Sequence, residues 1–201
     1  MRLPASDHTS RPWRIHEIAR DFRVEDVWEL PTPGGPADFP RLVAVFTSLN
    51  PVRSSSRTVR ALFAVRLKVG ALLNWDRPIA DWDSTGRTLR DRLPNDLRDG
   101  PSGPHSDALP FTPLYLTENE WAVEILSRTV DGVLHLGWVP DGTGGYRGQM
   151  AVLVKPNGLL GAVYMAAITP FRYLTVYPQL MRDIKHEWRV RASDPTLAPK
   201  I

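Results

Sequence analysis

The sequence predicts an α+β fold in which an antiparallel sheet packs against a long C-terminal helix. Between residues 114 and 155, short runs of alternating apolar and polar residues are separated by glycine-containing turns, which is typical of β-hairpins. From Phe171 to Trp188, apolar residues recur three or four positions apart, which is typical of one face of a helix. A sheet with one face covered by a helix would bury both patterns.

The first fifty residues predict short elements. Residues 1–13 are rich in proline, serine and threonine, so we expect a flexible arm there. The apolar spacing over 15–22 predicts a short helix. The alternation over 24–30 predicts the first strand, which the proline- and glycine-rich segment 31–36 ends. We expect a further short helix over 38–49.

A basic amphipathic helix is predicted over 57–75, after serines that can cap its N-terminus. Arg66 interrupts its apolar face between Val65 and Leu67. If the Arg66 side chain turns inward it could bind a carboxylate, and the alternative is that it extends along the surface to solvent. The segment 76–113 is the least regular part of the chain. We expect it to form a rim or lid, because a connection of this length is commonly functional.

The second half of the chain predicts strands by its alternation. They are expected over 114–116, 121–126, 133–139 and 146–155. The pair Asp131-Gly132 and the glycine-rich segment 141–145 predict hairpin turns between them. Residues 159–168 fit either a strand that leads into a helix or a helix throughout.

The C-terminal helix is predicted over 170–190. Pro178 must kink or restart it, because proline lacks a backbone donor. Residues 191–201 are expected to form a tail. One domain over 14–190 accommodates all of these elements, since 201 residues suit a single domain.

The composition narrows the classes of function. The chain has no cysteine, which excludes disulfides and thiolate chemistry, and its five histidines lack ligand spacing, so we expect no metal. No glycine-rich dinucleotide motif follows a strand, so we expect no cofactor. The net charge is only +3 and the basic residues are scattered, which argues against binding to nucleic acid. No apolar run reaches the roughly 20 residues of a membrane span, and no secretory signal is visible. We therefore expect a cytoplasmic protein without an integral membrane segment.

Strand alternation assigns side chains to the two faces of the predicted sheet. The inward, apolar set is expected to be Trp121, Val123, Ile125, Leu134, Leu136, Trp138, Met150, Val152 and Tyr164. Glu120 and Glu124 lie on the other face of their strand and are interpreted as outward. His135 lies on the face opposite Leu134 and Leu136. Solvent exposure is the favoured interpretation of His135, and a position in a cavity is the alternative.

Two C-terminal motifs carry a family resemblance. Residues 156–164 (PNGLLGAVY) and 169–174 (TPFRYL), followed by Met181, resemble the C-terminal signature of the bacterial domain-of-unknown-function family 2867. Residues 26–35 and 89–94 are similar to stand-alone members of that family, and the resemblance covers most of the chain. The bias for arginine, with 19 prolines and 7 tryptophans, is also typical of GC-rich bacteria.

The family is similar to the START-like superfamily, which includes polyketide cyclases and lipid-transfer proteins. That resemblance implies a helix-grip fold, in which the sheet wraps around the long C-terminal helix with a cavity between them, but it implies no defined reaction. We therefore hypothesise that the protein binds a small hydrophobic or aromatic molecule. The candidate ligand-binding residues are Arg66, Trp121, Trp138, Met150, Tyr164 and Tyr177. The alternatives are a cyclase- or dehydratase-type enzyme acting on a polyketide-like substrate, a partner-binding module that uses the basic helix 57–68, and a domain with a filled core.

Overall fold

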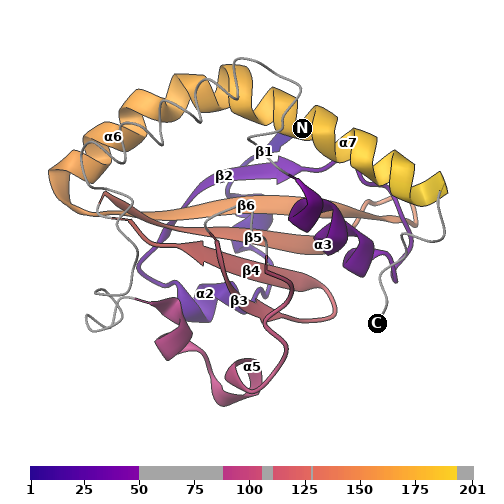
Figure 1. Cartoon of the computed structure of the whole chain (residues 1–201), viewed down its shortest axis with the longest axis horizontal. Coiled ribbons are helices and arrows are strands. Elements are labelled where there is room, and N and C mark those ends of the chain that lie inside the picture. The colour runs from indigo at the N-terminus through magenta and orange to yellow at the C-terminus, as the bar shows by residue number, and fades with distance from the viewer. Residues whose placement is uncertain (50–87, 106–110, 128, 194–201) are drawn as a thin grey trace.

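The computed structural model of the chain describes residues 1–49, 88–105, 111–127 and 129–193 (Figure 1). The predicted helix over 57–75, Arg66 and parts of the segment 76–113 lie outside these residues.

The structure is α+β, as predicted. Its described elements, in chain order, are β1 (Arg2–Leu3), α1 (Ser6–Thr9), α2 (Ile15–Ile18), β2 (Arg23–Glu29), α3 (Phe39–Ser48), the 3-10 turn η4 (Leu89–Arg92), α5 (Asn95–Arg98), β3 (Thr112–Leu116), β4 (Glu120–Ile125), β5 (Val130–Pro140), β6 (Tyr146–Pro156), α6 (Gly158–Phe171), the π-helical segment η5 (Arg172–Val176) and α7 (Tyr177–Ser193). Among the described residues, no helix is both long and apolar enough to cross a membrane.

The six strands form one antiparallel sheet in the order β1-β2-β6-β5-β4-β3. The β5–β6 hairpin is its centre, and its turn is the one predicted at 141–145. The carboxylate of Asp141 accepts hydrogen bonds from the backbone N–H groups of Thr143 and Gly145, at 2.8 and 3.0 Å. Gly142 and Gly144 have φ angles of 83° and 96°, which glycine adopts readily.

The turn predicted at Asp131-Gly132 is wrong. Both residues lie inside β5, where Asp131 pairs with Lys155 and Gly132 pairs with Val154. The chain turns earlier, in the segment between β4 and β5. There the Ser127 hydroxyl accepts from the backbone N–H of Val130 at 3.0 Å. A glycine inside a strand commonly marks a place where space is needed beside the strand.

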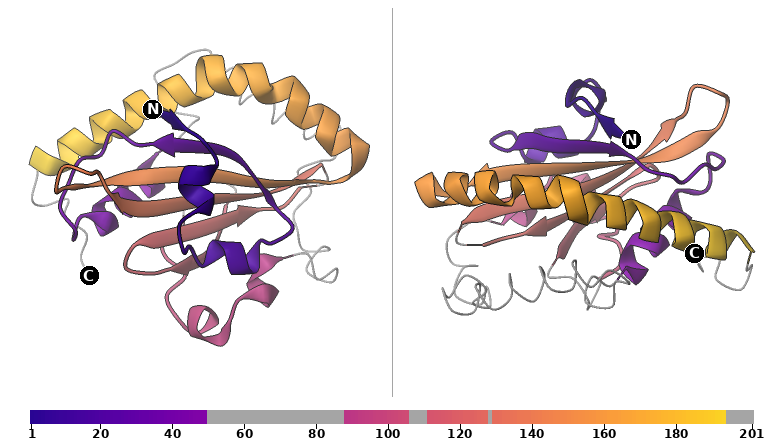
Figure 2. Two further views of the ribbon diagram at one scale, coloured as in Figure 1. Left: turned by 180° about the vertical axis from the view of Figure 1, so that it is seen from behind. Right: turned by 90° about the horizontal axis from the view of Figure 1, so that it is seen from above.

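One long, bent helical element covers a face of the sheet (Figure 1; the right view of Figure 2 shows it from above). It comprises α6, η5 and α7, so the segment 159–168 is helical throughout. The chain passes Pro178 by means of the π-helical turn, in which the backbone N–H of Tyr177 donates to the carbonyl of Arg172, five residues back. The helix restarts as α7 at Tyr177.

Apolar side chains pack on both faces of the sheet. The cluster beneath the long helix includes Trp121, Leu136, Trp138, Met150, Ile184 and Trp188, together with Phe39, Leu42 and Phe46 of α3. The cluster on the opposite face includes Ile15, Ile18, Leu89, Leu93, Leu97, Val133, Ala151 and Leu153. The sheet is therefore the middle of three layers.

The sheet is covered on the face opposite the long helix, which contradicts three expectations from the sequence. Glu120, Glu124 and His135 were expected to face solvent, but each is buried. Residues 1–13 were expected to form an arm. Instead β1 pairs with β2, and α1 lies against the sheet (Figure 2, left). His8 of α1 is fully buried. The reason is that N-terminal segments and the η4–α5 region supply apolar side chains and hydrogen bonds to this face.

The segment 76–113 also differs from a simple rim. Within its described part, Leu89, Leu93 and Leu97 are buried in the core. The carboxylate of Glu124 accepts a hydrogen bond from the backbone N–H of Leu89 at 2.9 Å, which anchors η4 to β4. This region is thus a structural part of the layer that covers the sheet on the face opposite the long helix.

Candidate functional site

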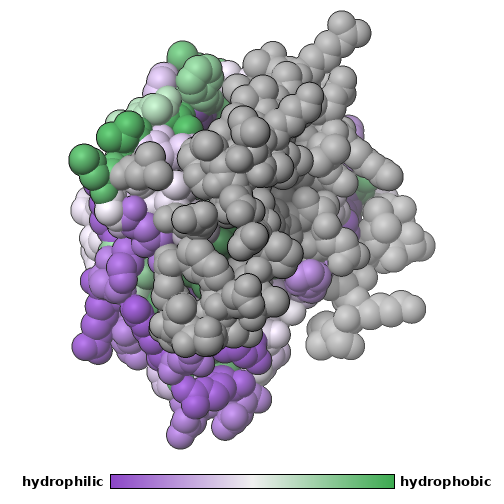
Figure 3. Space-filling model, turned by 60° about the vertical axis from the view of Figure 1, so that its left-hand side comes forward, coloured by the Kyte–Doolittle hydropathy of each residue, from purple (hydrophilic) through white to green (hydrophobic). Residues whose placement is uncertain are grey.

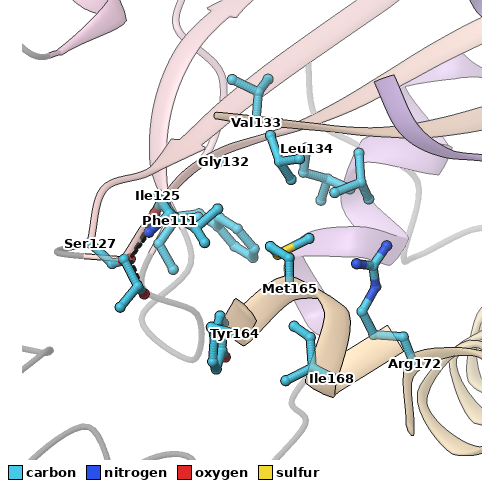
Figure 4. A pocket seen from close by; sticks show the side chains of 14 residues that line it. Phe111, Ile125, Ser127, Gly132, Val133, Leu134, Tyr164, Met165, Ile168 and Arg172 are labelled. Atoms are coloured by element: carbon cyan, nitrogen blue, oxygen red, sulfur yellow. Dashed lines mark hydrogen bonds between the residues drawn. The ribbon is translucent and has the colours of Figure 1, made fainter. Parts of the chain in front are cut away.

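A pocket of about 220 Å³ lies between α6 and the nearby ends of β4, β5 and β6 (Figure 4). Its lining is mainly apolar. The lining residues are Phe111, Ile125, Ser127, Thr129, Val130, Gly132, Val133, Leu134, Val152, Val154, Tyr164, Met165, Ile168 and Arg172. Figure 4 shows Ser127 and Tyr164 at one side of the pocket and Arg172 at the other, with Met165 and Ile168 of α6 between them.

Two glycines shape this pocket. Gly132 faces it from β5, and a Cβ atom placed there would lie 3.2 Å from Cγ2 of Ile125, so the glycine makes room for the Ile125 side chain in the pocket wall. Gly161 allows α6 to approach the turn before β5, because a Cβ atom there would lie 2.0 Å from the carbonyl oxygen of Thr129. The two glycines therefore let Ile125 and the start of α6 pack closely at this end of the pocket.

The start of α6 is fixed to the same turn by Asn157. Its side-chain N–H group donates to the carbonyl of Ser127 at 3.0 Å and to the carboxylate of Asp131 at 3.1 Å. Its backbone N–H donates to the carbonyl of Thr129 at 2.7 Å. These three bonds hold one wall of the pocket against another, so the pocket is largely preformed.

Arg172 closes the far side of the pocket. Its Nη2 atom pairs with the carboxylate of Asp26 on β2, which is only 2% exposed. The hydroxyls of Tyr173 and Tyr177 donate to the same carboxylate, at 2.6 Å for Tyr177. Because η5 is π-helical, positions five residues apart lie on one side of it, and the Nη2 of Arg172 lies 3.5 Å from the Tyr177 hydroxyl.

The electrostatic setting of this cluster favours a neutral phenol and an ionised carboxylate. Burial raises the pKa of Tyr177, so that its hydroxyl keeps its proton at neutral pH and donates to Asp26. Asp26 accepts these hydrogen bonds and two ion pairs, one with Arg172 and one with Arg2 at 3.8 Å. The guanidinium of Arg172 is therefore held in one orientation.

The structure brings only part of the predicted ligand-binding set to the pocket. Tyr164 lines it. Tyr177 lies beside Arg172 in the Asp26 cluster. Trp121 lines a separate hollow of about 20 Å³, which is large enough for about one water molecule. Trp138 and Met150 are buried in the core beneath α7 and α3.

Arg172 is one of the pocket residues that were not predicted from the sequence. It stands within the motif TPFRYL that supported the family resemblance, and a basic residue in an otherwise apolar helix was the available signal. From Pro156 to Phe171 the chain carries no charged residue, so Arg172 is the first charge after Lys155.

The outer face of α6 is apolar as well: Leu159 is 81% exposed and Val163 is 58% exposed, and hydrophobic surface is visible at the upper left of Figure 3.

A second cluster of polar side chains lies on the opposite face of the sheet. His135 Nε2 lies 3.0 Å from the Glu120 carboxylate, and His135 Nδ1 lies 3.1 Å from Nε2 of His8. The Tyr115 hydroxyl donates to Glu120 at 2.9 Å, and the backbone N–H of Arg14 donates to it at 3.1 Å. These contacts fix the protons: Nε2 of each histidine carries hydrogen, and Glu120 accepts from His135.

The pKa values in this cluster agree with that assignment. Burial, with help from the neighbouring His135, lowers the pKa of His8 to about 2, and burial also lowers the pKa of His135. Burial alone would raise the pKa of Glu120, but the hydrogen bonds from His135, Arg14 and Tyr115 outweigh it and lower that pKa. The histidines are neutral and Glu120 is ionised at neutral pH. Because His8 and His135 are fully buried, the cluster joins layers and is closed to a substrate.

Within the described ranges, no group of three or more histidine, cysteine, aspartate or glutamate side chains is arranged to hold a metal ion. No curated protein and no solved structure matches the sequence. One family model does match, over residues 18–179, and its description is "Protein of unknown function (DUF2867)". Since this match spans more than half of the sequence, the chain belongs to the DUF2867 family.

Proposed function

We propose that this protein binds a small, mainly apolar molecule in the pocket between α6 and strands β4–β6. The observation that carries the proposal is the pocket itself: a preformed, mainly apolar space with a few polar groups at its sides is the usual form of a small-molecule site. Its volume of about 220 Å³ lies below the roughly 300–1,000 Å³ of sites for drug-sized ligands. The ligand is therefore a single ring system or a short chain.

Binding is a better account than acid–base catalysis. A cyclase or dehydratase needs a general base at the bound substrate, for which carboxylate and imidazole groups are the usual side chains. Among the described residues that line the pocket there is no carboxylate and no imidazole. The ionisable lining groups are Tyr164 and Arg172. We therefore propose a binding protein, and we keep the START-like helix-grip assignment and a cytoplasmic location as parts of the same proposal. The six-stranded antiparallel sheet under one long helix supports the first of these.

The experiment starts with native mass spectrometry of the purified protein and organic extraction of any bound molecule. Two phenylalanine variants on α6 then test the site. Ile168→Phe fills the pocket, whereas Val163→Phe adds the same side chain to the exposed outer face of the helix. Circular dichroism confirms that both variants fold.

We expect wild type and Val163→Phe to retain the co-purified molecule and its stabilising effect, and Ile168→Phe to lose both. A ligand at 100 times its Kd stabilises a protein by about 2.7 kcal/mol, which a thermal-shift measurement detects readily. Equal retention of the molecule by both variants would place the binding site elsewhere and contradict the proposal.

A further inference from the structure

Arg172 lines the pocket, and one donor of its guanidinium lacks a hydrogen-bond partner. Its Nη1 atom is buried and has no hydrogen-bond partner among the described residues, while its Nη2 atom is held by Asp26. Glu25 is 3.7 Å from Nη1, which is an ion-pair distance but too long for a hydrogen bond. Buried polar groups in native proteins are almost always hydrogen-bonded, so an orphaned donor in a pocket calls for an acceptor.

The local charges leave room for an anion. Arg2 and Arg172 pair with Asp26, and Arg23 and Arg172 pair with Glu25. In this chain of ion pairs among the described residues, three arginines share two carboxylates, which gives a net charge of +1. Arg2 and Arg23 are more than half exposed and are screened by solvent, whereas the Arg172 side chain is 12% exposed. The cluster as a whole therefore favours an anion over a cation beside Arg172.

Asp26 cannot turn to satisfy the free donor. Its two carboxylate oxygens accept from the hydroxyls of Tyr173 and Tyr177, which fix the carboxylate in place. The apolar walls of the pocket, including Ile168 and Val154, offer no acceptor. The remaining sources of an acceptor for Nη1 are a bound ligand and water.

We propose that the ligand is a small hydrophobic carboxylate whose carboxyl group binds the Nη1 side of Arg172 while its hydrocarbon part lies against α6, β5 and β6. This inference rests on the proposed function and adds the chemical class of the ligand. A carboxylate fits both observations, because it accepts a charge-assisted hydrogen bond and supplies the missing negative charge.

The test uses matched probes that differ only in the polar group. They are 3-phenylpropanoate, 3-phenylpropanamide and 3-phenylpropylamine, and the octyl set octanoate, octanamide and octylamine, each titrated into the protein by calorimetry. For at least one skeleton we expect wild type to bind the carboxylate about tenfold or more tightly than the amide, and the amine more weakly still. Arg172→Gln should reduce the carboxylate–amide difference to about twofold or less.

Arg172→Gln leaves Asp26 without its buried cation, so the variant can fail to fold. The double variant Asp26→Asn/Arg172→Gln removes both charges and keeps hydrogen-bonding groups at both positions. It should fold and bind the carboxylate and the amide alike. Equal wild-type affinities for carboxylate and amide, or an unchanged preference in the double variant, would overturn the inference while leaving a hydrophobic site intact. No binding of any probe to wild type, or unchanged binding by Ile168→Phe, would instead overturn the proposed function, and this inference with it.

Discussion

The Nε2 atom of His8 lies 3.1 Å from the Nδ1 atom of His135, and both side chains are fully buried although 127 positions separate them in the sequence. This bond fastens the N-terminal helical turn to the central strand of the sheet. His135 in turn donates to Glu120, so the contact is one end of a continuous hydrogen-bonded chain. The first residues of the protein are thus part of its core.

His8→Ala should destabilise the protein markedly at pH 8. The substitution leaves Nδ1 of His135 without its donor and opens a cavity beneath the sheet. Each effect is of the order of 1–3 kcal/mol, so we expect a loss of about 2–4 kcal/mol in the free energy of unfolding, measured by urea denaturation. The matched control is His186→Ala on the exposed side of α7, which should change stability by about 0.5 kcal/mol or less. Equal effects of the two changes would contradict the buried contact.

The free energy of unfolding should fall as the pH decreases below about 6.5. His8 has a pKa of about 2 in the folded protein, and that of His135 is also lowered, so both stay neutral while the unfolded chain takes up protons near pH 6.5. The unfolded state therefore binds more protons, and acid favours it. Each such histidine contributes a slope of up to about 1.4 kcal/mol per pH unit.

The same measurement on His8→Ala separates this effect from other titrations. Between pH 7.5 and 5, above the usual range of carboxylate titration, the variant should show a smaller slope than wild type by up to about 1.4 kcal/mol per pH unit. Its stability should therefore approach that of wild type as the pH falls. Parallel pH profiles for the two proteins would show that His8 is not a buried neutral histidine.

Gly161→Ala should destabilise the protein, although alanine is the better helix former by roughly 1 kcal/mol. The added Cβ would lie 2.0 Å from the carbonyl oxygen of Thr129, so α6 must move away from the turn. We expect a loss of about 1–3 kcal/mol in chemical denaturation. The neighbouring change Ala162→Gly, at an exposed position of the same helix, should cost about 1 kcal/mol through helix propensity alone. A stabilising Gly161→Ala change would disprove the close approach.

Asp26 and Arg172 should show strong coupling in a double-mutant cycle. Asp26→Asn leaves a largely buried guanidinium without its nearest counterion and should cost about 3–5 kcal/mol in the free energy of unfolding. The double variant Asp26→Asn/Arg172→Gln removes both charges, so its loss should be clearly smaller than the sum of the two single losses. Additive losses would mean that the two side chains do not interact.

The sequence was sufficient for most of the strands and for the C-terminal half of the long helix, because their apolar residues repeat with periods of two and about 3.6. It was not sufficient for the layer that covers the sheet on the face opposite the long helix. His8 stands in a polar segment that resembles an arm, and nothing local shows that it meets β5. A signal was present in the strand: Val133 and Val139 share a face with His135, and apolar residues on both faces of a strand indicate that both faces are covered.

The general place of the pocket, between the sheet and the C-terminal helix, was predictable, but most of its lining residues were not. The predicted ligand set contained Tyr164 and Tyr177, which lie at or beside the pocket. It also contained Trp138 and Met150, which alternation alone cannot separate from pocket-lining residues, since both kinds face the helix. Gly132 was assigned to a turn because Asp-Gly is a common turn pair, although it lies inside β5, where it makes room for the Ile125 side chain in the pocket wall. Arg172 depends on a π-helical turn, which no periodic pattern specifies.

The strand order has a consequence for folding during synthesis on the ribosome. β2 lies beside β6, so the pairing of Arg23 with Val154 cannot form until the chain has been synthesised beyond residue 154. The hairpins from β3 to β6 have close neighbours in sequence and can form early, whereas β1, α1 and β2 must wait for a distant partner. The amino-terminal portion, made first, is therefore completed among the last, and until then its apolar residues are exposed to chaperones and to other nascent chains.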